Sequence, residues 1–340
     1  MTKRLSVIIL NWNGEKLLKE FLPSVVRHTV GEDVEVIVAD NGSTDRSLDV
    51  LAVDFPEVRV MRFEKNLGFS GGYNNAIREV DAEYVLLLNS DVAVPEGWWQ
   101  PLLKFMDDHA DVGACQPKIL SYRCRRMFEY AGAAGGLLDK YGYPYCRGRL
   151  FDKVEEDLGQ YDGEAADIAW ASGAALMVRR EIYLKAGGLD ELFFAHMEEI
   201  DLCCRIHNLG YRVCVVPQSK VYHLGGASLA QGDPKKTYLN FRNNLLLLHK
   251  NLPKEKGRKV LFRRRLMDTL AFFMFMAKFD FMNAGAVLRA HSDFKKYRKS
   301  YTVFPDKDIL STLPGADRCI VADRYLKPLT TRKKTPHKKS

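Results

Sequence analysis

Residues 6–10, SVIIL, and residues 34–39, VEVIVA, are apolar runs, and each is followed directly by a polar residue, Asn11 or Asp40. Runs rich in Val and Ile are typical of strands buried on both faces. Between them, residues 15–27 carry apolar side chains at the spacing of a helix. Strands that alternate with helices in this way predict an α/β fold with a mostly parallel, doubly wound central sheet flanked by helices.

The alternation continues along the chain. We predict strands at residues 58–63, 84–88, 174–178 and 211–216, the last ended by Pro217, and helices at residues 44–53, 72–80 and 198–209. Ser43 or Thr44 is the expected N-cap of the first of these helices, and Gly210 the expected C-cap of the last. From residue 233 to about residue 300 the pattern is helical, which predicts a helical C-terminal extension.

The net charge of +8 over 340 residues is unevenly distributed. Residues 250–265 hold eight basic residues and one acidic residue, and residues 327–340 hold six basic residues and no acidic one, which predicts a basic disordered tail. Such basic segments suit an anionic membrane surface or a nucleic acid. We expect neither a signal peptide nor a membrane span, because no apolar run is long enough, and we expect reduced cysteines in a cytoplasmic protein.

Polar residues stand where three of the predicted strands end, at Asn11, Asp40 and Asn89. Ligands of parallel sheets bind beyond the carboxyl ends of the strands, so these positions indicate a binding site. Asp40 begins the run DNGSTD, which is either a strand-to-helix turn or a contact to a base or ribose. The run NLGFSGGYN that begins at Asn66 is either a glycine-rich connector or, through Gly71 and Gly72, a phosphate cradle.

Two further stretches carry candidate chemistry. In LLLNSD, Asn89 and Asp91 share one side if the chain stays extended, and their oxygens could hold Mg²⁺ or Mn²⁺; the alternative is an ordinary polar strand exit. In HMEEID, Glu198 and Glu199 begin a helix, where they are either dipole partners or, one of them, a general base. His223, followed by two glycines, is either structural or a ligand.

Taken in order, these motifs resemble family-2 glycosyltransferases of the GT-A fold, and most of all the bacterial rhamnosyl- and galactofuranosyl-type transferases. The resemblance covers residues 5–244. It implies that the chain is an inverting, metal-dependent hexosyltransferase that moves a sugar from a nucleoside diphosphate of the UDP or dTDP type to a hydroxyl of a growing surface polysaccharide on a lipid carrier.

The resemblance also implies a role for each motif. The residues expected to bind the nucleotide are Asn11, Asn13, Asp40, Asn66, Gly71, Gly72, Asn89 and Arg242. Asp91 and His223 would bind a divalent metal, Mg²⁺ or Mn²⁺, and Glu198 or Glu199 would be the catalytic base, with Glu199 favoured by its place in the motif. The family's Asp-x-Asp stands here as Asn89-Ser90-Asp91, and its Glu-Asp as Glu198-Glu199.

On this interpretation residues 1–118 form the nucleotide-sugar-binding half of the GT-A domain, residues 119–232 the acceptor-binding half, residues 233–326 the helical extension and residues 327–340 the tail. Phe262, Leu266, Leu270, Phe273 and Ala277 recur at helical spacing beside basic residues. Such a helix either lies in an anionic membrane interface, on the cytoplasmic face of the inner membrane, or packs on the catalytic domain. No nucleic-acid partner is expected. The alternatives are an inactive nucleotide-binding scaffold and a basic nucleic-acid-binding protein.

Overall fold

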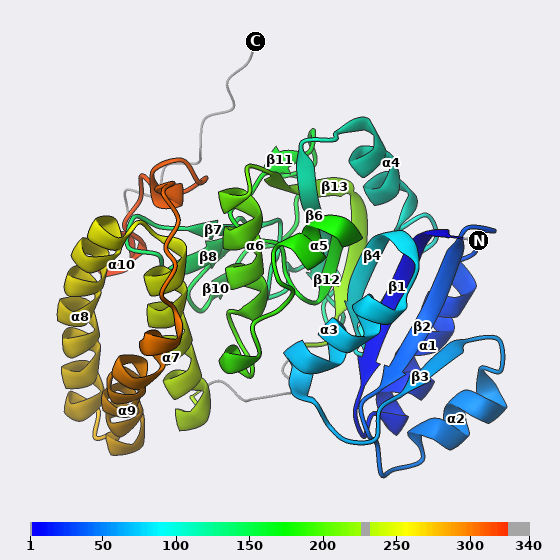
Figure 1. The fold of residues 1–340 in the computed structure, drawn as a ribbon, viewed down its shortest axis with the longest axis horizontal. Helices are drawn as coiled ribbons and strands as arrows, with labels where there is room; N and C mark the ends of the chain where they lie inside the picture. The colour runs from blue at the N-terminus through cyan, green and yellow to red at the C-terminus, as the bar shows by residue number, and fades with distance from the viewer. Residues whose placement is uncertain (1, 226–231, 326–340) are drawn as a thin grey trace.

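A computed structural model describes residues 2–225 and 232–325 of the chain, and the predicted tail lies outside them (Figure 1). Within these residues nine strands form one central sheet in the order β11-β13-β6-β12-β4-β1-β2-β3, with β5 paired to β13. The strands are β1 (Lys3–Asn11), β2 (Val34–Asp40), β3 (Arg59–Arg62), β4 (Ala82–Asn89), β5 (Val92–Ala93), β6 (Val112–Ser121), β11 (Ala166–Asp167), β12 (Ala175–Arg179) and β13 (Arg212–His223). A second, small sheet consists of β7 (Gly136–Leu138), β8 (Pro144–Cys146), β9 (Arg149–Leu150) and β10 (Lys153–Val154).

Helices cover both faces of the central sheet, which confirms the predicted α/β class. They are α1 (Glu15–His28), α2 (Ser47–Asp54), α3 (Gly68–Glu79), α4 (Gln100–Asp108), α5 (Arg180–Lys185), α6 (Glu198–Asn208), α7 (Pro234–Asn251), α8 (Lys254–Ala277), α9 (Phe281–Tyr297) and α10 (Ile320–Tyr325). Side chains that alternate along β1 belong to two hydrophobic cores, one on each face of the central sheet. Val7 and Ile9 pack with α1, α2 and α4, whereas Ile8 packs on the side of α3, α5, α6 and α7.

Several element boundaries differ from the predictions. Helix α2 begins at Ser47 without a side-chain cap from Ser43 or Thr44, and α3 begins at Gly68 rather than at residue 72. Strand β13 does not end at Pro217, because a register shift between Val216 and Lys220 carries the proline, which lacks an N–H, past its partner strand. Strand β6 is continuous across residue 118, so the proposed boundary between the two halves of the domain falls inside a strand.

The C-terminal extension is helical as predicted. Helices α7, α8 and α9 pack against one another, and α7 also packs against α6 of the sheet domain (Figure 1). In the parts of the chain that the structure describes, no helix is long and apolar enough to cross a membrane.

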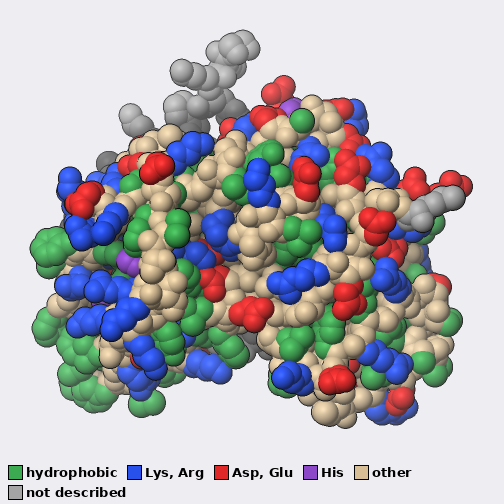
Figure 2. Space-filling model, viewed as in Figure 1, with side chains coloured by type: hydrophobic (Ala, Val, Ile, Leu, Met, Phe, Trp, Pro, Cys, Tyr) green, Lys and Arg blue, Asp and Glu red, His purple; other side chains and the backbone are tan. Residues whose placement is uncertain are grey.

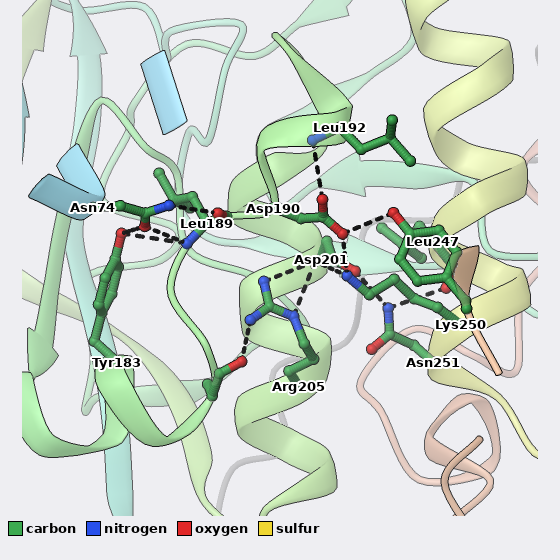
Figure 3. Close-up of polar contacts among 12 residues, drawn as sticks. Asn74, Tyr183, Leu189, Asp190, Leu192, Asp201, Arg205, Leu247, Lys250 and Asn251 are labelled. Carbon is green, nitrogen blue, oxygen red and sulfur yellow. Dashed lines mark hydrogen bonds and ion pairs between the residues drawn. The ribbon is translucent and has the colours of Figure 1, made fainter. Parts of the chain in front are cut away.

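Polar side chains, rather than apolar ones alone, join α7 to α6. Asp201 of α6 has no exposed surface, and its carboxylate accepts hydrogen bonds from Arg205 at 2.7 and 3.0 Å, from Lys250 Nζ at 3.0 Å and from Asn251 Nδ2 at 2.7 Å (Figure 3). Lys250 also binds Asp190 at 2.6 Å. The i, i+4 pair of Asp201 with Arg205 therefore belongs to a larger network that fixes α7 against α6.

We predict that Asp201→Ala lowers the free energy of unfolding by about 3–5 kcal/mol, because Arg205 and Lys250 then lose the carboxylate that compensates their buried charges. Urea denaturation followed by circular dichroism measures the change. The control is Asp108→Ala, which removes the partner of Lys104 in an exposed pair with the same i, i+4 spacing. Equal losses for the two variants would contradict the prediction.

Candidate active site at the strand ends

Strands β1, β2, β4, β6 and β13 all end at one edge of the sheet. The pairs β1–β2, β1–β4 and β13–β6 are parallel, and β12 lies antiparallel between β4 and β6, so these five strands run in the same direction. Asn11, Asp40, Asn89 and His223 are the last residues of β1, β2, β4 and β13. The fold therefore places these four predicted residues along one edge.

Asn11 and Asp40 form the first part of this edge. Asn11 Nδ2 donates to Asp40 Oδ1 at 3.0 Å and to Ser43 Oγ at 3.2 Å, and the backbone N–H of Ser43 donates to Asp40 Oδ2 at 3.0 Å. Both side chains are buried, and Asn11 Oδ1 has no hydrogen-bond partner. A buried amide oxygen without a donor is a position where a ligand N–H or O–H can bind.

Asn13 and Asn66 organise the neighbouring loops. Asn13, with φ +50°, accepts a hydrogen bond from the N–H of Thr44 at 2.7 Å. Asn66 Oδ1 accepts from Asn41 Nδ2 at 3.0 Å and from the N–H of Gly68 at 2.8 Å. Both asparagines are exposed beside the edge, and Trp12, 56% exposed, lies next to Asn13 in sequence. The indole offers an apolar surface at the end of β1.

Gly71 and Gly72 do not form the loop that the phosphate prediction requires. Both are buried in the first turns of α3, where a Cβ on Gly72 would lie 2.5 Å from Leu10 Cδ1 and one on Gly71 would lie 3.2 Å from Leu67 Cβ. The small size of Gly72 therefore lets α3 pack closely on β1, and Gly71 leaves room for Leu67 at the start of its own helix. The glycine-rich connector, the alternative interpretation of this motif, describes them better.

Asn89, Asp91 and His223 meet at the centre of the edge. His223 Nε2 lies 3.1 Å from Asp91 Oδ1 and 3.4 Å from Asn89 Nδ2, although residues 90 and 91 form a turn rather than the extended chain we expected. His223 Nδ1 lies 3.4 Å from Glu129 Oε2. Burial alone would lower the pKa of His223, but the hydrogen bonds and charges of Asp91 and Glu129 raise this pKa to about 10.

The Asp91–His223 pair fits a divalent cation with further ligands from elsewhere. Two neighbouring ligands of an octahedral cation, each bound at about 2.1 Å, lie roughly 3.0 Å apart, which is close to the distance between Asp91 Oδ1 and His223 Nε2. Among the described residues, no three His, Cys, Asp or Glu side chains are grouped to hold a metal by themselves. A cation here would need oxygens from a bound ligand.

Glu198 and Glu199 begin α6 beside this centre. Glu199 Cβ lies near Gly173, and the next residue, Ala174, accepts a hydrogen bond from the N–H of Asn89 at 3.0 Å. Burial raises the pKa of Glu199 to about 7, although the N–H groups of Glu199 and Ile200 act in the opposite direction. Burial, together with the charge of Glu199, raises the pKa of Glu198 well above its usual range. Glu199 is therefore the carboxylate that can take up and release a proton near neutral pH.

The loop before α6 has an unusual backbone. Phe194, His196 and Met197 have φ values of +64°, +66° and +76°, a region that costs a non-glycine residue about 1–3 kcal/mol. Asn243 of α7, fully buried, donates to the carbonyl oxygens of Phe193, Ala195 and His196 at 2.9, 2.9 and 2.7 Å. These three hydrogen bonds offset the cost and fix the loop that leads into Glu198 and Glu199.

Arg242 supports the same loop. Its Nη2 donates to the carbonyl oxygens of Leu192 at 2.9 Å and Phe193 at 3.0 Å, and its Nε donates to Asn243 Oδ1 at 2.8 Å. The side chain is buried, so its donors are directed at the protein rather than outward. The predicted contact with a phosphate does not agree with this geometry, because the loop carbonyls are buried acceptors that need these donors.

Sequence reasoning missed Glu129 and Asn243. Glu129 lies in a loop 94 residues before His223, and Asn243 lies 47 residues after His196, so neither shares a local motif with its partner. The adjacent Arg242-Asn243 pair on a predicted helix was the one available signal.

We predict that Asn243→Ala increases the rate of amide hydrogen exchange in residues 194–200 by about tenfold or more, because the strained loop loses the three hydrogen bonds from Asn243 Nδ2. Exchange followed by mass spectrometry measures this rate. The control is Asn244→Ala: Asn244 is equally buried on α7 but donates to Gly142 O instead. If Asn244→Ala increased exchange in residues 194–200 as much as Asn243→Ala does, the assigned role of Asn243 would be wrong.

Comparisons with known proteins agree with the family resemblance that the sequence motifs indicated. The N-acetylglucosaminyl-diphospho-decaprenol L-rhamnosyltransferase of Mycobacterium tuberculosis is 28% identical over 239 residues, which cover 66% of this chain and 76% of that protein. The dTDP-rhamnosyl transferase RfbF of Shigella flexneri is 25% identical, with 74% of this chain and 82% of that protein covered.

Two solved structures share the GT-A fold of this chain. The S. aureus TarS structure, residues 1–349 in complex with UDP-GlcNAc, has a TM-score of 0.58 at 18% identity and covers 86% of this chain and 80% of its own. The mannosyltransferase PcManGT of Pyrobaculum calidifontis, in complex with GDP-Man and Mn²⁺, has a TM-score of 0.52 at 15% identity and covers 87% and 76%. Residues 6–145 thus match the model of glycosyl transferase family 2, and the chain is similar in sequence to the rhamnosyl-type transferases.

Proposed function

We propose that this protein is an inverting hexosyltransferase that moves a sugar from a nucleoside diphosphate of the UDP or dTDP type to a hydroxyl of a growing, lipid-linked surface polysaccharide. The observation that carries the proposal is that Asp91, His223 and Glu199 lie together at the edge of the sheet where the parallel strands end, which we call the strand-end edge. A charge-binding centre and a carboxylate that titrates near neutral pH are the two components that glycosyl transfer to a hydroxyl requires. The rhamnosyl-type relatives, by their names, act on dTDP-rhamnose or a diphospho-decaprenol acceptor.

The nucleoside would bind between β1 and β2. Asn11 Oδ1 lacks a donor there, and Asp40 lies beside it with its carboxylate held by Asn11 and Ser43. Asn13 and Asn66 are exposed beside the same edge, where they would contact the base or ribose. Asn89 would approach the diphosphate, because its amide lies 3.4 Å from His223.

Asp91 and His223 would hold a divalent cation, Mg²⁺ or Mn²⁺, together with oxygens of the donor diphosphate. PcManGT was solved with Mn²⁺, which supports this assignment. When bound, the cation neutralises the negative charge that develops on the leaving diphosphate. The protein contributes an ordered pair of ligands, since Glu129 holds His223 from its other nitrogen.

Glu199 would accept the proton of the acceptor hydroxyl. The acceptor oxygen then forms a bond to the anomeric carbon while the bond from that carbon to the diphosphate oxygen breaks, and attack opposite the leaving group inverts the configuration. Glu198 has a buried Oε2 without a partner, and burial together with the charge of Glu199 raises its pKa well above its usual range, which favours its neutral form beside Glu199. A lipid-linked acceptor would place the enzyme at the cytoplasmic face of the inner membrane.

We predict that one pyrimidine nucleoside diphosphate with Mn²⁺ raises the melting temperature of the protein by several degrees, since ligand at about 100 times its Kd stabilises by roughly 2.7 kcal/mol. A thermal-shift panel of UDP, dTDP, GDP, CDP and ADP, each with and without Mn²⁺, tests this. Asp91→Asn should remove the dependence on Mn²⁺ while the variant stays folded. No shift with any nucleotide would contradict the proposal and favour an inactive scaffold.

We predict that turnover increases tenfold per pH unit below about pH 7 and is constant above it, because the pKa of Glu199 is about 7 and only its ionised form accepts a proton. Glu199→Gln should lower kcat by about a hundredfold or more, with little change in donor binding. Glu198→Gln is the matched control, because an amide resembles the neutral carboxyl group. The assignment fails if Glu198→Gln abolishes turnover and Glu199→Gln does not.

A further inference from the structure

Helix α8 turns a charged pair toward the protein and an apolar stripe toward solvent, which is the reverse of the usual arrangement in a surface helix. Arg264 and Asp268 are buried, 2% and 1% exposed, and face the protein as an ion pair. The apolar stripe predicted from the sequence faces outward, with exposed fractions of about 60% at four positions: Phe262 60%, Leu266 60%, Leu270 58% and Phe273 61%. The possibility that this stripe packs on the catalytic domain is therefore excluded.

The exposed apolar surface continues beyond α8 onto the turn and the first part of α9. Its further members are Met274, Met276, Phe279, Phe281, Met282 and Leu288. Phe279 is 79% exposed at the turn, with a φ of +58°. We call these six residues, together with the four of the stripe, the apolar tip. Figure 2 shows hydrophobic side chains gathered over the lower ends of α8 and α9, below a band of Lys and Arg. Apolar patches of this kind mark interaction sites.

The surroundings of the apolar tip are basic. Residues 254–297 hold eleven Lys and Arg against four Asp and Glu. All four acids have partners within the fold: Glu255 pairs with Arg258, Asp268 pairs with Arg264, Asp280 caps α9, and Asp293 accepts from Tyr238. Lys278, beside the turn, is exposed and has no ion-pair partner in the described part of the chain. An apolar surface bordered by unpaired cations matches an anionic lipid bilayer.

The apolar tip lies on the side of the molecule where the parallel strands end. Helix α7 begins on this side, at Pro234, and runs away from the strand ends for about 27 Å. Helix α8 returns in the opposite direction over about 36 Å. Because α8 is the longer helix, its end extends past the start of α7. Asn283 Nδ2, at the start of α9, donates to Gly232 O at 3.0 Å, so the tip adjoins the segment that follows His223. In Figure 1 the strands β1 and β13 and the α8–α9 turn all point to the lower side.

We infer that the apolar tip inserts into the interfacial region of an anionic membrane and that Lys278 and its basic neighbours bind the lipid headgroups. A second copy of the chain fits this surface less well, because a symmetric contact would bring the two basic borders against each other. Docking in this way would orient the strand-end edge toward the bilayer, where a lipid-linked acceptor would be. The role of the acceptor rests on the proposed function, whereas the docking itself does not.

Vesicle flotation of the full chain, residues 326–340 included, tests the inference. The protein should float with vesicles of phosphatidylcholine and phosphatidylglycerol, mixed roughly three to one, and should remain at the bottom with phosphatidylcholine alone. The triple variant Phe273→Ser, Phe279→Ser, Phe281→Ser should reduce the bound fraction about tenfold or more. Its control is Val53→Ser with Leu158→Ser, which removes apolar residues 77% and 79% exposed on the sheet domain.

Charge is tested separately. Lys278→Glu should weaken flotation, whereas Lys185→Glu, an equal change on exposed α5, should not. All variants should keep the nucleotide-dependent thermal shift, which separates loss of docking from failure of the proposed function. Absence of flotation of the unmodified chain with anionic vesicles would overturn the inference. So would a stable dimer by light scattering that the triple variant dissociates while flotation is unchanged.

Discussion

The arrangement of the candidate site depends on a carboxylate with no exposed surface, that of Asp201. It accepts hydrogen bonds from Arg205 on its own helix and from Lys250 and Asn251 on α7, so every strong acceptor direction is used. An ionised group is stable in the interior only when it is paired in this way. Two of the three donor residues belong to α7, so the contacts of Asp201 join helix α6 directly to the C-terminal extension.

The extension is therefore part of the site rather than an appendage. Asn243 on one side of α7 fixes the strained loop before Glu198, and Asn244 beside it accepts from Arg264 of α8 and donates to Gly142 O. The contact that orders the loop and the contact that orders α8 thus come from adjacent residues of one helix.

The sequence allowed the strands, their order of appearance and the polar residues at their ends to be predicted, because buried strands leave a continuous apolar pattern. Periodicity did not reveal which way α8 faces, since the Arg264–Asp268 pair repeats at the same spacing as the apolar stripe. From the sequence alone, Arg242 was expected to contact the bound nucleotide. Its actual acceptors, the carbonyl oxygens of Leu192 and Phe193, lie 50 and 49 residues away, so the local sequence gives no sign of them. Glu129 was missed for the same reason: its partner is distant in sequence.

The inverted polarity of α8 also explains why that helix is ordered without an apolar partner on its outer side. The inward face carries Arg264 and Asp268, which together reach Asn244, Tyr143 and His291 on three different segments. This polar anchoring holds α8 without using its apolar residues. On the proposed function, the apolar residues are then free to contact lipid while α7 keeps the loop before Glu199 in place, so a soluble donor and a membrane-held acceptor can reach the same edge of the sheet.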